Sequence, residues 1–198
     1  MKRSVSLSLI LLTLLLSACG GTAHARKEEF LRLRADWLSR GGAQLRASLR
    51  ADYGRRVYDF VLRYEGDGEG GTLTVEEPVL IRGVKAIVGK EGVRLEYDGA
   101  LLDTGAILEG LSPLETFPLL LRAWGQGCVT DCWKETWQGE ACLTAEMDLT
   151  GPGDGEEILC RSRFRLPEGQ PLTAEFSAGG RTVISCVFLP WEEDSSDV

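Results

Sequence analysis

Cysteine and histidine are the residues of this 198-residue chain whose side chains are best suited to covalent or metal chemistry, and there are six cysteines and one histidine. Nucleophilic catalysis by a Ser-His-Asp or Cys-His arrangement requires a histidine that transfers the proton. The only histidine, His24, lies near the N-terminus, in a segment that we expect to be a solvated tether. The sequence therefore excludes histidine-dependent catalysis within the folded domain.

Five of the cysteines lie in the second half of the chain, and their spacing is a weak match to a metal site. Cys128 and Cys132 are separated by three residues and have no histidine partner, so we expect no bound metal. An odd number of thiols cannot all pair within one chain, and a single disulfide with Cys128 and Cys132 as its members is left open. Buried cysteine behaves as a small apolar residue, and we expect core packing for most of the set, which is Cys128, Cys132, Cys142, Cys160 and Cys186.

The charged residues indicate neither nucleic-acid binding nor catalysis. Asp and Glu outnumber Lys and Arg by 30 to 22, for a net charge of −8, and no basic cluster is present to neutralise phosphates. The glycine-rich segment 66–71 is acidic and has no lysine, so it does not match a phosphate-binding loop. Adjacent carboxylates such as Glu76 and Glu77 lie at strand ends or turns, where solvated charge is the default. We expect a protein that is not an enzyme and that uses no cofactor.

The N-terminus has the features of a secretion signal. Residues 1–18 combine the basic Lys2 and Arg3 with an apolar stretch, 5–16, that is too short to span a bilayer as a folded helix. The junction Leu16-Ser17-Ala18-Cys19 resembles the lipobox of bacterial lipoproteins, whose cysteine is diacylated and forms the mature N-terminus. The resemblance implies that Cys19 carries acyl chains such as palmitate and holds the protein on the extracytoplasmic face of the cell membrane. An ordinary secreted protein with a coincidental cysteine is the alternative.

Hydrophobic periodicity predicts the elements of the domain that follows the lipidated tether, residues 19–27. Helical spacing predicts a helix over 28–39 and a looser helical turn that continues to residue 49. Ser112-Pro113 supplies an N-cap and a first-turn proline for a helix that continues to Trp124. Alternation with a period of two predicts strands at 57–64, 73–77, 84–88, 93–97, 133–137, 143–149, 158–166, 172–176 and 183–189.

These elements predict an α+β fold in a single domain, residues 28–191, followed by an acidic tail, 192–198. About nine strands with one strong helix between them favour a large curved antiparallel β-sheet, a half-barrel, with helices on its concave face. Strands that are neighbours in the sequence should pair. No internal repeat and no second domain are evident.

One face of the predicted sheet and one stripe of the predicted helix are apolar and should meet. A ligand groove and a filled core are both compatible with this pattern, because half-barrels often contain cavities but apolar faces also pack tightly. The candidate groove residues are Tyr58, Phe60, Leu62, Tyr64, Leu73, Val75, Val93, Leu95 and Tyr97 from the strands, and Leu114, Phe117, Leu121 and Trp124 from the helix.

The order of these elements resembles the lipoprotein-sorting carrier superfamily, the LolA-like half-barrel, and in particular its membrane-anchored lipoprotein members. The resemblance rests on the N-terminal helix, the meander from Tyr58 to Tyr97, the helix after Ser112-Pro113 and the ending that starts with Leu166-Pro167. It implies an apolar groove that holds a lipid or another hydrophobic ligand. The alternative that it implies is an interaction or sensor module with a filled core and an envelope protein as its partner. The family has no catalytic residue to transfer.

Cys19 is the residue whose modification can be tested from the sequence alone. Metabolic labelling with a fatty-acid analogue should mark the wild-type protein and not Cys19→Ser, because the Cys19 thiol is the expected attachment point. The variant should accumulate as precursor or become soluble. Equal labelling of both proteins would contradict the lipoprotein interpretation.

Overall fold

The computed structural model describes residues 24–66, 70–89, 92–97, 100–102, 111–150 and 157–191. The expected signal peptide, Cys19 and the acidic tail lie outside these residues. An N-terminal helix spans residues 24–39, so it begins four residues before the predicted start, and His24 at its first position is exposed.

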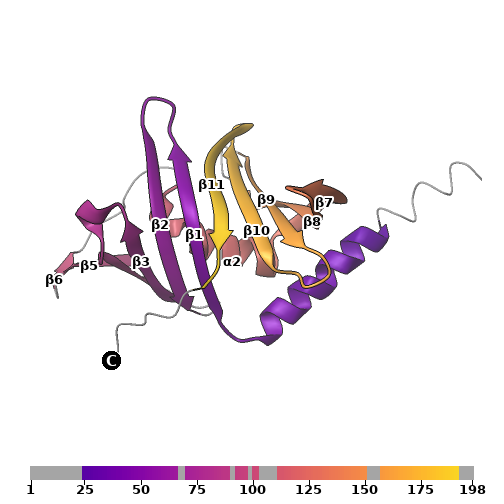
Figure 1. Ribbon diagram of the computed structural model, residues 1–198, viewed down its shortest axis with the longest axis horizontal. Helices are drawn as coiled ribbons and strands as arrows, with labels where there is room; N and C mark the ends of the chain where they lie inside the picture. Colours follow the sequence, from indigo (N-terminus) through magenta and orange to yellow (C-terminus); the bar gives the residue numbers. More distant parts are fainter. Residues whose placement is uncertain are drawn as a thin grey trace, which may run out of the picture.

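A single sheet of eleven antiparallel strands forms the body of the protein, in the order β6-β5-β4-β3-β2-β1-β11-β10-β9-β8-β7 (Figure 1). This confirms the predicted α+β half-barrel with its curved antiparallel sheet. The strands are β1 Ala43–Asp52, β2 Val57–Gly66, β3 Gly71–Glu77, β4 Lys85–Gly89, β5 Gly92–Tyr97, β6 Ala100–Leu102, β7 Cys128–Trp137, β8 Glu140–Asp148, β9 Ile158–Arg165, β10 Pro171–Ala178 and β11 Arg181–Leu189.

The chain builds the sheet in two halves that meet at β1 and β11. Strands β1 to β6 pair in sequence order toward one edge, and β7 to β11 pair in sequence order from the opposite edge back to the middle. The pairing of β1 with β11, which runs from Arg46↔Leu189 to Ala51↔Ile184, joins the halves. The prediction that sequence neighbours pair is confirmed within each half. The exception is β6 and β7, which form the two edges and are connected through helix α2, Thr116–Gln126.

The first strand corrects the sequence analysis, which placed a helical turn there. Ala43, Leu45, Ala47, Leu49 and Ala51 of β1 are all buried and alternate with more exposed residues, which is the pattern of a strand with one covered face. Alanine has a low strand propensity and a high helix propensity, so three alanines on the buried face hid the alternation. The three-residue strand β6 was also missed, and the sheet has eleven strands where about nine or more were expected.

Helix α2 begins as the sequence predicts. The Ser112 hydroxyl accepts a hydrogen bond from the backbone N–H of Leu114 at 3.3 Å, and a short 3-10 turn, η2 Pro113–Glu115, leads into the helix. In Figure 1, α2 lies behind β1, β11 and β10, and the N-terminal helix runs along one end of the sheet. The buried side chains of α2 are Thr116, Phe117, Leu120, Ala123 and Trp124.

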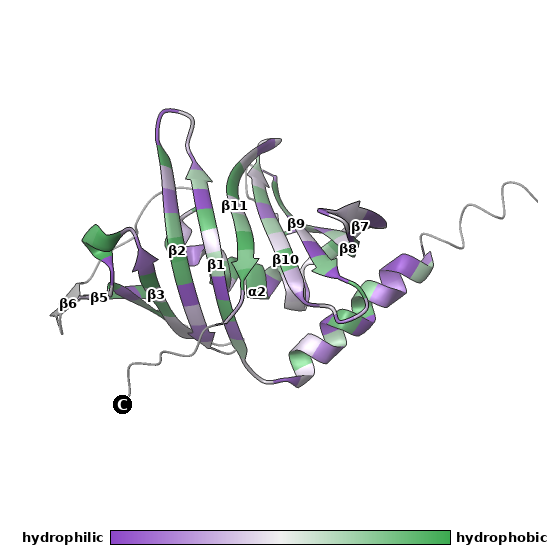
Figure 2. Cartoon of the chain, in the orientation of Figure 1, coloured by the Kyte–Doolittle hydropathy of each residue, from purple (hydrophilic) through white to green (hydrophobic). Residues whose placement is uncertain are grey.

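The two faces of the sheet differ in chemistry, and this difference explains why the helices cover only one of them. Apolar and polar residues alternate along the strands, as the bands in Figure 2 show. On the face away from α2, Arg163 contacts Glu135 at 2.8 Å and Glu175 at 3.0 Å. On the same face, Glu76 accepts from Arg46 at 2.7 Å and from Arg63 at 2.8 Å. These cross-strand ion pairs keep that face hydrated, so the apolar face must be buried by the helices.

Trp124 connects both helices to the sheet. Its indole N–H donates to the Ser162 hydroxyl of β9 at 2.8 Å, in a buried position. Its ring lies 4.7 Å from Trp37 of the N-terminal helix, 5.4 Å from Phe164 of β9 and 5.6 Å from Phe188 of β11, measured between ring centroids. Aromatic pairs at these distances favour tilted or edge-on geometry, which all three contacts have.

Substitution of Trp124 should therefore destabilise the whole domain. We expect Trp124→Ala to lower the free energy of unfolding by about 3–5 kcal/mol through the cavity that it leaves. Trp124→Phe should lower it by about 1–3 kcal/mol, because the buried Ser162 hydroxyl loses its donor. Urea unfolding of a protein that starts at Gly20, and so keeps every described residue, measures both values. Trp137→Phe on edge strand β7 is the control, and a loss from Trp124→Phe no larger than that of the control would contradict this role.

Candidate hydrophobic ligand site

A first hollow of about 550 Å³ lies on the apolar face of the sheet, beside the start of α2. It is bounded by β2, β3 and β5, by η2 and by a second 3-10 turn, η1 Val79–Ile81. No charged side chain lines it, and only Tyr97 and Ser112 bring side-chain hydroxyls. Its lining residues are Phe60, Leu62, Val75, Leu80, Ile81, Val84, Leu95, Tyr97, Ser112, Pro113 and Leu114.

A second hollow of about 640 Å³ lies on the same face, along the side of α2 that does not reach the core. It is more polar than the first, because Glu115, Arg122 and Gln126 of the η2–α2 segment stand at its rim. Its apolar lining comes from Leu38, Tyr64, Val88, Val93, Pro118, Leu119 and Leu121.

The structure distributes the predicted groove residues between these hollows and the core. Leu73, Phe117 and Trp124 are fully or almost fully buried and belong to the core. Tyr58 is exposed, next to Phe60 on the same face of β2. The first hollow is lined by Phe60, Leu62, Val75, Leu95, Tyr97 and Leu114, and the second by Tyr64, Val93 and Leu121.

Sequence reasoning missed the contribution of η1 to the first hollow. The predicted strand ended before Pro78, and the residues from Pro78 to Arg82 were given no part in the groove. The run Pro78-Val79-Leu80-Ile81 is entirely apolar, which is unusual for a turn between two strands and was the available signal. Leu80 is 89% exposed at the rim of the hollow, and Ile81 packs against the core.

Helix α2 lies between the hollows and the core because its Phe117 ring packs against the sheet. The Phe117 ring stacks on Tyr64 of β2 with centroids 5.7 Å apart and an interplanar angle of 11°. Tyr64 in turn covers the glycine-rich hairpin between β2 and β3. A Cβ atom on Gly71 would lie 2.6 Å from the Tyr64 hydroxyl oxygen, so this position requires glycine. Gly66 and Gly71 pair across the ends of β2 and β3, and residues 67–69 of the acidic glycine segment lie outside the described residues.

Aromatic rings extend from the first hollow toward solvent. Tyr53 and Tyr58 lie 6.2 Å apart, and Tyr58 stacks on Phe60 at 6.4 Å. The Tyr53 hydroxyl donates to the Leu111 carbonyl at 2.7 Å. Burial raises the pKa of the Tyr53 phenol, and the nearby Tyr58 adds to this shift, so the group stays neutral at physiological pH. The aromatic surface that continues from Phe60 toward solvent therefore includes the neutral Tyr53 phenol.

The cysteines supply no chemistry to either hollow. All five described cysteines are free thiols, so the disulfide that the sequence left open between Cys128 and Cys132 is absent from the described residues. Core packing is confirmed for Cys132, Cys160 and Cys186. Cys142 is buried outside the hydrophobic core, and Cys128 is exposed. Burial raises the pKa of the Cys132 thiol to about 11, with a further contribution from Asp131, and that of Cys160 to about 12. Both thiols stay protonated at neutral pH and are poor nucleophiles.

Within the described residues, no group of three or more His, Cys, Asp or Glu side chains is arranged to hold a metal ion. Neither described helix combines the length and the hydropathy that a transmembrane helix needs.

Comparison with solved structures identifies relatives in fold. A Vibrio parahaemolyticus domain assigned to outer membrane lipoprotein sorting matches with a TM-score of 0.51 at 12% identity, over 88% of this chain and 80% of that one. A LolA superfamily protein from Nitrosomonas europaea matches at 0.39 and 16% identity, over 71% and 66% of the two chains. The Mycobacterium tuberculosis lipoprotein LppX matches at 0.43 and 15% identity, over 87% and 97%. No protein-family model and no curated protein sequence match the chain.

Two neighbouring leucines of α2 separate the core from the second hollow and provide a matched test. Leu120 is fully buried, whereas Leu121 is half-buried and lines the hollow. Leu120→Ala should lower the free energy of unfolding by about 2–5 kcal/mol, because it leaves a cavity in the core. Leu121→Ala should lower it by only about 1 kcal/mol, because its side chain is already partly exposed. Equal losses in urea unfolding would show that the hollow is filled in solution.

Proposed function

We propose that this protein, which has a LolA-like half-barrel fold, binds a hydrophobic ligand in the hollows between α2 and the half of the sheet formed by β2 to β5. The observation that carries the proposal is the first hollow, whose lining contains no charged side chain. An apolar cavity of this size on one side of a sheet is typical of sites for small hydrophobic molecules, which span roughly 300–1,000 Å³. The similarity to a domain assigned to lipoprotein sorting supports the same class of ligand.

An acyl chain is the ligand that fits this lining. Its binding energy would come from removing methylene groups from water, at about 0.8 kcal/mol for each buried CH₂. Such a ligand needs no hydrogen-bond donor inside the cavity, and the Ser112 hydroxyl is already used to cap η2. A polar headgroup would stay outside, where Tyr53 and Tyr58 line the approach to the hollow.

We further propose that acyl chains on Cys19 hold this domain on the extracytoplasmic face of the membrane. The sequence of the junction supports this anchoring, and the described domain begins only five residues later, at residue 24. A short tether would keep the domain close to the bilayer, which is the source of acyl ligands. A protein bound in this way acts as a local binding protein and carries out no covalent chemistry.

An interaction module with an envelope protein as partner is the second candidate function. It is favoured by the exposure of Val79 and Leu80, 73% and 89%, at the tip of η1. Exposed apolar residues that cluster at one place commonly mark a contact surface. This candidate differs from the first in requiring no occupant in the hollows.

Binding of an environment-sensitive fatty-acid probe tests the ligand proposal. The probe should bind the protein that starts at Gly20 and gain fluorescence as it enters the apolar hollows. Leu114→Gln and Leu121→Gln, which place an amide in the lining of the two hollows, should each weaken binding by about tenfold, because an unpaired amide in an apolar site costs roughly 1–3 kcal/mol. Thermal unfolding of each variant verifies that the fold is retained.

Val187→Gln is the matched control, because Val187 is an exposed apolar residue on the opposite face of the sheet. It should bind the probe as the wild type does. The carrier proposal fails if the wild type does not bind the probe, or if all three variants lose binding equally. In that case the interaction module becomes the better explanation of the exposed η1 tip.

A further inference from the structure

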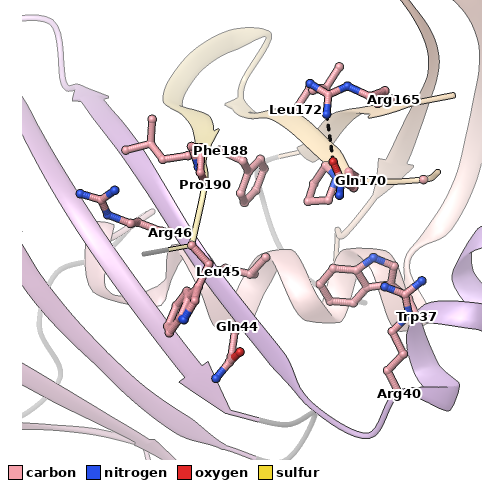
Figure 3. A pocket seen from close by; sticks show the side chains of 14 residues that line it. Trp37, Arg40, Gln44, Leu45, Arg46, Arg165, Gln170, Leu172, Phe188 and Pro190 are labelled. Carbon is pink, nitrogen blue, oxygen red and sulfur yellow. Dashed lines mark hydrogen bonds between the residues drawn. The ribbon is translucent and has the colours of Figure 1, made fainter. Parts of the chain in front are cut away.

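A third cavity, of about 500 Å³, lies at the end of the sheet beside the last turn of the N-terminal helix, and it does not share a residue with either hollow (Figure 3). Its walls come from the N-terminal helix, β1, the turn between β9 and β10, and the end of β11. The lining residues are Trp37, Arg40, Gln44, Leu45, Arg46, Arg165, Gly169, Gln170, Pro171, Leu172, Phe188, Leu189, Pro190 and Trp191.

The cavity exists because β10 and β11 separate there. Their pairing ends at Thr173↔Val187. Beyond that point, β11 continues to pair with β1 as far as Leu189, while β10 continues to pair with β9 as far as Pro171. Each strand is therefore held by its other neighbour, and the space between them forms a cleft. The residues from Pro171 to Leu172 and from Phe188 to Trp191 line its two sides.

The charged side chains of this cleft are all cationic. Three arginines and two glutamines line it, and no Asp or Glu does. Arg165 is held in place by Glu140, at 2.6 and 3.1 Å, and by the Gln170 amide oxygen at 2.9 Å. With its oxygen occupied in this way, Gln170 presents its NH₂ group as a donor. Arg46 is neutralised by Glu76 on the opposite face of the sheet.

Arg40 is the cation of the cleft with the weakest partner. Within the described residues its ion pair is with Asp36, at 3.7 Å, which is longer than a hydrogen bond, and both side chains are mostly exposed. The Gln44 amide has no hydrogen bond within the described part of the chain. In Figure 3, Arg40 lies beside Trp37, and Gln170 lies between Arg40 and Arg165. Leu45 and Phe188 lie together on the other side of the cleft. A carboxylate or phosphate between Arg40 and Gln170 would meet donors from two sides.

The floor of the cleft is apolar and aromatic. Leu45 and Leu172 are buried, Phe188 packs against the core, and Trp37 and Trp191 add two indole rings. The Trp191 ring is fixed by the Arg63 guanidinium, which lies 5.0 Å from its centroid. A small inorganic anion would leave this floor exposed, whereas an anion with an apolar body would cover it.

We propose that this cleft binds an amphiphilic organic anion, with its carboxylate or phosphate held between Arg40 and Gln170 and its apolar part on Leu45, Phe188 and Trp37. Both head groups share the chemistry that the cleft recognises, which is a compact anion attached to an apolar chain. This site is independent of the apolar hollows beside α2, because its lining and its charge are different.

The position of the N-terminal helix sets the width of this cleft, since the helix supplies Trp37 and Arg40. The helix is held close to the β9–β10 turn at Gly169, which has a φ of +70°. A Cβ atom there would lie 2.5 Å from the Leu33 side chain of the helix. The close approach therefore depends on glycine at the edge of the cleft.

Calorimetric titration with three ligands of equal chain length tests the proposal: octanoate, octyl phosphate and octanol. Octanoate and octyl phosphate should bind the protein that starts at Gly20 at least about tenfold more tightly than octanol, because only they form charge-assisted hydrogen bonds. Raising the salt concentration from about 0.05 M to about 0.5 M should weaken binding of the two anions only. A preference for one anion over the other identifies the head group.

Arg40→Gln should remove most of the preference for the anions over octanol, and Gln170→Ala should reduce it by a smaller factor. Arg122→Gln is the matched control, because Arg122 is an exposed arginine at the rim of the second hollow. It should leave anion binding unchanged. Equal binding of octanol and octanoate, or an equal effect of Arg40→Gln and Arg122→Gln, would overturn the proposal. Failure of the fatty-acid probe to bind at the hollows would not contradict this proposal, because the effect of Arg40→Gln on anion binding reports on the cleft alone.

Discussion

The packing of Trp124 against the sheet is the interaction on which the rest of the structure depends. The two halves of the sheet share only the β1–β11 pairing, and the apolar face that they form together needs a cover. Trp124 provides the centre of that cover, because its ring contacts β9, β11 and the N-terminal helix, and its N–H is satisfied by Ser162. A buried indole with its one donor paired contributes apolar area without a desolvation penalty. Its position also fixes the rotation of α2 about its own axis.

That rotation explains why the same face of the sheet contains both a packed core and open space. With Phe117 and Trp124 directed at the sheet, Leu119 and Leu121 must lie on the flank of α2. Eleven strands form a face too wide for two short helices to cover, and the uncovered part lies over β2 to β5. The two hypotheses that the sequence left open, a filled core and a groove, therefore describe different parts of one surface.

The sequence predicted those elements whose signal is local. The alternation from Tyr58 to Tyr97 and the Ser112-Pro113 helix start are encoded within a few residues, and the structure confirms both. Strand β1 was missed because its buried face is mostly alanine, and its identity depends on pairing with β11, which comes from the other end of the domain. The cleft between β10 and β11 could not be predicted, since it results from the point at which two registers diverge. Leu73 belongs to the core and Leu95 lines a hollow, although both lie on predicted strands. The position of α2 decides which residue is covered, and the alternation in the sequence does not encode that position.

The hollows and the cleft would each recognise an amphiphile, by different physical means. The hollows offer apolar area, which gives affinity in proportion to chain length and discriminates little between head groups. The cleft offers paired donors above an aromatic floor, which discriminates by charge and geometry. Trp37 belongs to the wall of the cleft and lies edge-on to Trp124 beneath it. The aromatic cluster that closes the core is therefore also the support of the charged site, and the stability of the fold and the shape of the cleft depend on the same rings.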